Sequence, residues 1–168
     1  GSSLGYSILQ AKANLQCPFI FHASDTILGP EDEVSFPEFN WCAGAHKKES
    51  SQYRTIKVNG GLVSIINEKG EINFDYSYIG LCGIKDYESF WECLEKVYSD
   101  DPKNSSLSDV HVINEMLESR KFSFRKVLKW IDVGNTNELS AARKEFKSNL
   151  EVLDKERESV YLLGDSFI

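Results

Sequence analysis

Short apolar runs and amphipathic stretches alternate along most of this chain. Apolar residues three or four positions apart indicate a helix, whereas a period of two or a short continuous apolar run indicates a strand. These patterns predict helices over 4–16, 86–98, 108–120 and 136–150, and strands over 19–21, 54–58, 62–67, 72–84 and 122–130. Such alternation is typical of an α/β domain, and we expect a mixed, mostly parallel sheet flanked by helices.

Two stretches between these elements differ in character. Asn59-Gly60-Gly61 separates two strand-like runs, and it predicts a tight hairpin because Asn-Gly supplies the positive φ angles of a primed turn. Residues 29–53 mix acidic, aromatic and Lys-rich pieces without a regular period. We therefore expect little regular structure there, and loops of this length in compact domains are often functional.

The charge balance excludes some classes of partner. The 168 residues carry a formal net charge of −7, together with 41% hydrophobic residues. A surface for nucleic acid or for an anionic membrane needs clustered Lys and Arg, so neither partner is expected. An enzyme of this charge that handles phosphates would need a metal ion or a few well-placed cations.

The cysteines indicate a reducing compartment. Cys17, Cys42, Cys82 and Cys93 form no C-x-x-C pair and no zinc spacing with histidine. Reduced thiols suggest the cytoplasm. Neither a signal peptide nor a membrane-spanning stretch is expected from the sequence. Cys42 has no identifiable base partner, so cysteine catalysis is not favoured.

Two aspartates follow predicted strands. Asp25 comes after the apolar run 19–21, and Asp132 comes after the strand over 122–130. Ligands of α/β sheets bind beyond the carboxyl ends of strands, and Mg²⁺ prefers carboxylate and phosphate oxygens. The alternative is that each aspartate simply stabilises the turn that follows it.

Glu68-Lys69 lies at the end of the predicted hairpin. There the glutamate can accept hydroxyl groups of a sugar, and the lysine can pair with a phosphate. By itself this pair is typical of an ordinary solvated turn.

Taken in order, several motifs resemble those of the sugar-phosphate nucleotidyltransferases, the NDP-sugar pyrophosphorylases. The resemblance covers residues 5–150. It rests on the helix over 5–16, the strand PFIFHASDT ending at Asp25, Asn67-Glu68-Lys69, Tyr78-Ile79-Gly80, and the Trp-x-Asp-x-Gly pattern of WIDVGN at Asp132.

The resemblance implies a Rossmann-like fold and a set of site residues. Asp25 and Asp132 would bind Mg²⁺ as catalytic metal ligands. Lys69 would hold the acceptor phosphate as a further catalytic group, and Glu68 with the Gly80 backbone would orient the sugar. The implied substrates are a nucleoside triphosphate and a sugar-1-phosphate, as in nucleotide-sugar and polysaccharide biosynthesis.

The chain also departs from the family pattern. No G-x-G-x-R segment for the triphosphate occurs, and Ser24-Asp25 stands where the family has Gly-Asp. Residues 151–168 resemble the linker and first strand of a kinase-like phosphotransferase domain. We therefore expect residues 1–150 to form a nucleotidyltransferase-like domain that lacks its N-terminal Gly-rich segment, with 151–168 starting a linker or a second domain.

The expected function is nucleotidyl transfer to a sugar-1-phosphate with release of pyrophosphate, performed as part of a longer protein and with little activity in this stretch alone. Two alternatives remain open. One is an inactive sugar-phosphate-binding or regulatory domain, and the other is a transferase that acts on phosphocholine. The aromatic loop 29–53 leaves homo-oligomerisation open as well.

Overall fold

The computed structural model describes residues 3–46 and 50–144. These residues divide into two compact units, and the boundary along the chain falls between Trp130 and Ile131. The first unit contains α1 (Leu4–Leu9), α2 (Tyr87–Asp100) and α3 (Asp109–Leu117). Its strands are β1 (Phe19–His22), β2 (Thr26–Leu28), β3 (Trp41–Ala45), β4 (Thr55–Asn59), β5 (Leu62–Asn67), β6 (Tyr76–Ile84) and β7 (Ser123–Val127). The short strand β8 (Trp130–Asp132) starts at the last residue of this unit.

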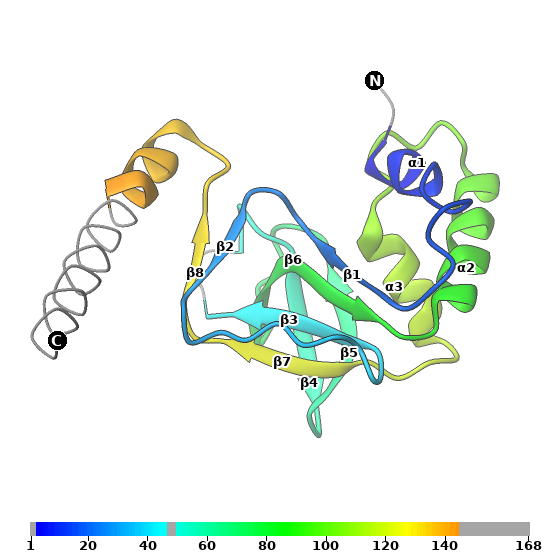
Figure 1. The fold of residues 1–168 in the computed structure, drawn as a ribbon, viewed down its shortest axis with the longest axis horizontal. Helices are drawn as coiled ribbons and strands as arrows, with labels where there is room; N and C mark the ends of the chain where they lie inside the picture. The colour runs from blue at the N-terminus through cyan, green and yellow to red at the C-terminus, as the bar shows by residue number, and fades with distance from the viewer. Residues whose placement is uncertain (1–2, 47–49, 145–168) are drawn as a thin grey trace, which may run out of the picture. The chain divides into compact units, whose positions relative to one another are not determined.

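Five strands close into a barrel, and β1 adds a sixth strand beside β6. The strand order is β1-β6-β3-β7-β5-β4, and the ring closes because the long strand β6 also pairs with β4. Figure 1 shows the strands wrapped around one another, with α1, α2 and α3 gathered beside them. The α/β class and the mixed sheet are confirmed.

The expectation of a mostly parallel sheet is wrong. Among the strand pairs of the described residues, β3 and β7 run parallel, whereas β6 runs antiparallel to β1, β3 and β4. The hairpin strand β5 is antiparallel to both of its neighbours. A sequence pattern identifies a strand but not the direction of its partner strand. The parallel pairing was expected because helices and strands alternate along the chain.

The region 29–53 contains a strand that the sequence pattern did not predict. β3 lies at the centre of the sheet, and all five of its residues are buried. Because WCAGA is buried throughout and rich in small residues, it shows neither alternation nor a bulky apolar run. Gly44 is needed at this position, since a Cβ there would lie 2.9 Å from the carbonyl oxygen of Ser77.

The predicted hairpin is confirmed, with a shift in the turn. Asn59 pairs with Leu62, so the two-residue loop consists of Gly60 and Gly61, at φ +56° and +79°. Both residues adopt the left-handed region that a primed turn requires. The helices α2 and α3 are also confirmed, and Ser108 with His111 forms a capping box at the start of α3.

Two predicted elements are shorter than expected. The helix expected over 4–16 ends at Leu9. It is followed by turns whose hydrogen bonds join residues three apart, such as the bond that Ala11 N–H donates to Ile8 O. The strand over 122–130 breaks after Val127, because the Asp32 carboxylate accepts hydrogen bonds from the N–H groups of Leu128 and Lys129, at 2.8 and 2.9 Å.

One apolar cluster holds the first unit together. The interior of the barrel packs against α2 and α3, and the cluster includes Ile56, Ile66, Cys82, Phe90, Leu94, Ile113 and Met116. Among the described residues, no helix is both long and apolar enough to cross a membrane.

The second unit is described from Ile131 to residue 144. Helical residues begin at 136, as expected, and Asn135 is the N-cap: its side chain accepts hydrogen bonds from the N–H groups of Asn137 and Glu138. The predicted boundary after residue 150 and the kinase-like tail over 151–168 lie outside the described residues.

Candidate functional site

The turn that carries Asp25 connects β1 to β2 and is fastened to β6. Ala23 N–H donates to Gly80 O at 2.8 Å, which extends the β1–β6 pairing by one step. Asp25 itself is exposed, and its carboxylate has no hydrogen-bond or ion-pair partner within 3–46 and 50–144. A rigidly held turn thus presents a carboxylate whose oxygens are available to a ligand.

Thr26 fixes this turn from the buried side. Its hydroxyl donates to Ile79 O at 2.6 Å, and only 6% of the residue is exposed. His22 Nε2 lies 3.0 Å from Thr26 O, and the ring nitrogen is the donor because a carbonyl oxygen only accepts. Both contacts brace the residues on either side of Asp25.

Gly80 has a backbone conformation that other residues rarely adopt. Its φ is +68°, and a Cβ at this position would lie 2.6 Å from the Ala23 Cβ. A glycine is therefore required both by the left-handed conformation and by the close approach of the Asp25 turn. The structure thus places Gly80 against Ala23 in the turn that carries Asp25.

The Glu68-Lys69 turn lies at the end of β5, and both residues are exposed. Gly70 N–H donates to Ser50 O at 3.0 Å, and Glu68 Oε2 accepts from Arg54 Nε at 3.2 Å. The turn is therefore attached to the segment that leads into β4.

Strand pairing connects this turn to Gly80. Thr55 pairs with Asn67 on one side and with Ser77 on the other, and Tyr78 N–H donates to Arg54 O at 2.8 Å. Adjacent chain segments thus lead from Glu68 through Arg54 and Tyr78 to Gly80, and from there to the Asp25 turn. Four of the five predicted site residues lie along this one path.

A buried polar pair supports the middle of the path. The Tyr78 hydroxyl donates to Asp109 Oδ2 at 2.6 Å, and only 3% of Asp109 is exposed. Burial raises the pKa of Asp109, while the hydrogen bond from Tyr78 and the charge of Arg54 act in the opposite direction. Burial also raises the pKa of Tyr78 well above its ordinary value, so this phenol stays protonated and donates.

The fifth predicted residue, Asp132, belongs to the second unit. Its Oδ1 accepts the Gly134 N–H at 2.8 Å, an aspartate turn of the kind named as the alternative to a metal ligand. The other carboxylate oxygen has no partner in the described part of the chain. The pairing of Asp132 with Asp25 stays a prediction.

Both aspartates fit a hard cation in their donor chemistry, since each offers at least one carboxylate oxygen without a partner among the described residues and Mg²⁺ binds such oxygens. No group of three or more His, Cys, Asp or Glu side chains with the arrangement of a metal site occurs among the described residues. A cation held by either aspartate would therefore need oxygen atoms from its substrates or from water as further ligands.

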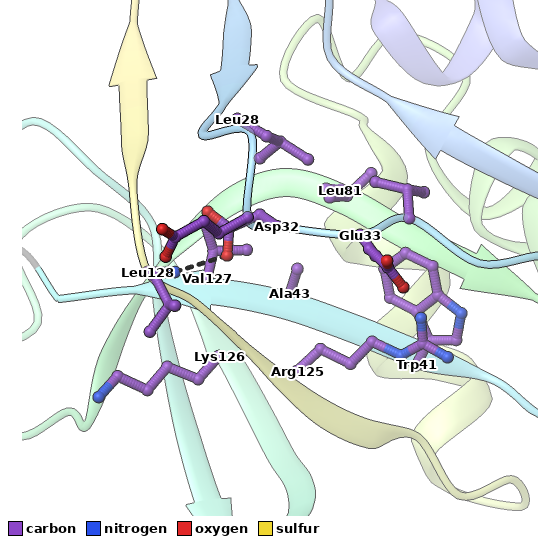
Figure 2. A pocket seen from close by; sticks show the side chains of 12 residues that line it. Leu28, Asp32, Glu33, Trp41, Ala43, Leu81, Arg125, Lys126, Val127 and Leu128 are labelled. Atoms are coloured by element: carbon purple, nitrogen blue, oxygen red, sulfur yellow. Dashed lines mark hydrogen bonds between the residues drawn. The ribbon is translucent and has the colours of Figure 1, made fainter.

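A pocket of about 430 Å³ on the face of β3 and β7 that points away from the main core is lined by other residues, among them Leu28 and Leu81 (Figure 2). Arg125 lies over the ring of Trp41, with 4.2 Å from its guanidinium carbon to the ring centroid. Its Nη1 donates to Ser35 Oγ at 2.8 Å, and burial lowers the pKa of this guanidinium. Trp41 and Ser35 thus orient the Arg125 guanidinium, and Lys126 is a second cation in the pocket lining.

Three residues that shape the path were not singled out by sequence reasoning: Thr26, Arg54 and Asp109. Thr26 could have been identified from its position, since it directly follows Asp25. No sequence pattern indicates a role for Arg54 or Asp109, because their roles depend on partners far away in the sequence.

Comparison with known proteins identifies the fold. Neither a family model nor a curated protein matches the chain. Solved structures do match, among them a UDP-glucose pyrophosphorylase complexed with UDP-glucose, at 18% identity and a TM-score of 0.69, covering 88% of this chain and 63% of that one. The CTP:phosphocholine cytidylyltransferase of Streptococcus pneumoniae matches at 9% identity and a TM-score of 0.65, with 86% and 64% covered.

The inositol-1-phosphate CTP transferase of T. maritima matches at 15% identity and a TM-score of 0.61, with 87% and 61% covered. The chain thus spans about three fifths of the length of these solved structures. At such identities the similarity establishes the fold alone, and the chemistry has to be argued from the residues of this chain. The described chain shares the fold of the nucleotidyltransferases that act on sugar phosphates and related phosphate esters.

Proposed function

We propose that this chain carries the acceptor-binding and metal-binding part of a nucleotidyltransferase that joins a nucleotidyl group to a sugar-1-phosphate and releases pyrophosphate. The observation that carries the proposal is the continuous path from the Glu68-Lys69 turn to the Asp25 turn. The fold adds support, because solved structures that share it include a UDP-glucose complex and a UTP complex of sugar-nucleotide pyrophosphorylases.

In the proposed reaction, an oxygen of the acceptor phosphate attacks the α-phosphorus of the triphosphate in line with the departing pyrophosphate. No general base is needed, since a phosphate monoester is already ionised at neutral pH. The protein's task is therefore to position the reactants and to offset their negative charge. Lys69 pairs with the acceptor phosphate, and Glu68 accepts hydrogen bonds from the sugar.

Asp25 and Asp132 are the residues that would hold Mg²⁺, which would supply positive charge to the phosphate oxygens. The hydrogen bond of Thr26 and the close approach of Gly80 to Ala23 hold the turn that carries Asp25. In a chain of net charge −7, Lys69 and a bound cation would provide the positive field that the substrates require.

Binding and turnover test the proposal separately. Calorimetric titration of the 168-residue chain with glucose-1-phosphate in the presence of Mg²⁺ should show binding, which Lys69→Gln and Asp25→Asn weaken about tenfold or more. The exposed residues Lys103 and Asp100 offer matched controls, and Lys103→Gln and Asp100→Asn should leave binding unchanged.

Little turnover is expected of this stretch alone, so the binding measurements decide the proposal. Pyrophosphate release from a panel of nucleoside triphosphates would show in addition that the chain catalyses the transfer by itself. If Mg²⁺ and glucose-1-phosphate bind equally well to the native sequence and to both site variants, the proposed site is wrong.

A further inference from the structure

We propose that Arg54 is a specificity residue of the acceptor site, and that with Glu68 it selects a phosphate ester bearing hydroxyl groups over phosphocholine. This inference rests on the proposed function, because it takes Glu68 as a contact of the acceptor. It decides between two acceptor classes that the motifs alone leave open.

Arg54 is held in place by main-chain and side-chain contacts. Its carbonyl oxygen accepts the Tyr78 N–H at 2.8 Å, which ties it to the strand that carries Gly80. Its Nε donates to Glu68 Oε2 at 3.2 Å, and 22% of its side chain is exposed against 62% for Glu68. The cation is thus the inner partner of the pair and the carboxylate the outer one.

A buried carboxylate helps to keep this cation where it is. Asp109 lies close enough for the charge of Arg54 to favour its ionised form. Arg54 therefore interacts electrostatically with two carboxylates, those of the buried Asp109 and the exposed Glu68.

The pair still has hydrogen-bonding capacity for a ligand. Within 3–46 and 50–144, the terminal Nη groups of Arg54 and the Oε1 of Glu68 have no hydrogen-bond partner. Donors and an acceptor therefore lie side by side. A hydroxyl group both donates and accepts, so a polyol can use both members of the pair.

Phosphocholine is a poor match for the same pair. Its trimethylammonium group has no N–H or O–H to donate and no lone pair to accept with. Its positive charge would also have to approach Glu68 beside the guanidinium of Arg54, and like charges at such distances repel each other. A site for this ligand would instead favour aromatic faces and unpaired carboxylates.

The experiment compares the affinities of the 168-residue chain for glucose-1-phosphate and phosphocholine, both with Mg²⁺, by calorimetry. The native sequence should prefer glucose-1-phosphate about tenfold or more, and Arg54→Gln should reduce this ratio to about threefold or less. Arg54→Lys keeps the charge and should retain most of the preference. Arg120→Gln is the matched control, since Arg120 also pairs with a carboxylate, Asp86 Oδ2 at 3.4 Å, and it should leave the ratio unchanged.

The outcomes separate this inference from the proposed function. An unchanged ratio in Arg54→Gln, with the variant still folded by circular dichroism, overturns the inference alone. A native preference for phosphocholine overturns it as well and supports the other acceptor class. If the native sequence binds neither ester, both the inference and the proposed function fail.

Discussion

The two turns that bear predicted site residues are held in opposite ways. The Asp25 turn is locked from inside by the buried hydroxyl of Thr26 and by the contact between Ala23 and Gly80. The Glu68-Lys69 turn is exposed and is held by a main-chain hydrogen bond and one ion pair at the surface. Buried contacts tolerate little displacement, whereas exposed ion pairs contribute little to stability.

This difference suits the two proposed tasks. A metal ligand has to be held within a fraction of an ångström, and the Asp25 turn has the contacts to do so. A group that receives a flexible sugar or polyol can move, and the Glu68-Lys69 turn is free to adjust. Substitutions should therefore destabilise the fold at the first turn and alter ligand preference at the second.

Gly80→Ala should have the largest effect on stability. The new Cβ would lie 2.6 Å from the Ala23 Cβ at a φ of +68°, so crowding and backbone strain act together. We expect a loss of about 2–4 kcal/mol in the free energy of unfolding, measured by urea denaturation.

Gly70→Ala provides the control for this variant. Gly70 also has a positive φ, +94°, but apart from its chain neighbours no atom of the described residues lies within 4 Å of the point that the new methyl group would occupy, so only backbone strain applies. Its cost should be about 1–2 kcal/mol. Equal losses in the two variants would mean that the contact with Ala23 does not constrain the Asp25 turn.

Thr26→Val should have the next largest effect. The variant keeps the side-chain shape but leaves the Ile79 carbonyl without its hydroxyl donor in a buried position. We expect a loss of about 1–3 kcal/mol by the same measurement, together with weaker Mg²⁺-dependent ligand binding. Thr26→Ser keeps the hydroxyl and should restore most of the binding; if it binds as poorly as the valine variant, the hydrogen bond is not what positions Asp25.

The sequence predicted those features that depend on neighbouring residues. The loop of Gly60 and Gly61 follows from turn chemistry, and α2 and α3 follow from helical periodicity. β3 was missed because a completely buried run of small residues has no periodic pattern. The antiparallel pairings of β6 were missed because strand direction depends on the partner strand.

The same distinction applies to the candidate site. Asp25, Glu68 and Gly80 could be proposed from short motifs, but the contacts that organise them could not. Thr26 bonds to a carbonyl 53 residues away, and Tyr78 bonds to a carboxylate 31 residues away. Contacts over such separations depend on the folded topology, and no local pattern encodes them.

Asp109 should make the stability of the interior dependent on pH. Because burial raises its pKa, the native state holds this proton more tightly than the unfolded state does. Its contribution to the free energy of unfolding is therefore present below the ordinary carboxyl range and is lost as the pH rises through the raised pKa. Asp109→Asn cannot lose a proton, so the difference in free energy between the variant and the native sequence should grow with pH over that window.

Urea denaturation at several values between about pH 4 and pH 7 measures this difference. Asp100→Asn, at an exposed position of α2, serves as the control and should show little change with pH. A difference for Asp109→Asn that stays constant over the whole range would contradict the assignment.

The smallest effect on stability is expected at the exposed turn. A double-mutant cycle with Arg54→Gln and Glu68→Gln should give a coupling free energy of about 1 kcal/mol or less, decreasing as salt is added, because 62% of the Glu68 side chain is exposed to solvent. The cycle with Arg120→Gln and Asp86→Asn should give a similar value. The two pairs should differ only in ligand preference, which Arg54→Gln changes and Arg120→Gln does not. A coupling at the Arg54 pair as large as the loss in Thr26→Val would show that this turn, too, is rigidly held, and the contrast between the two turns would disappear.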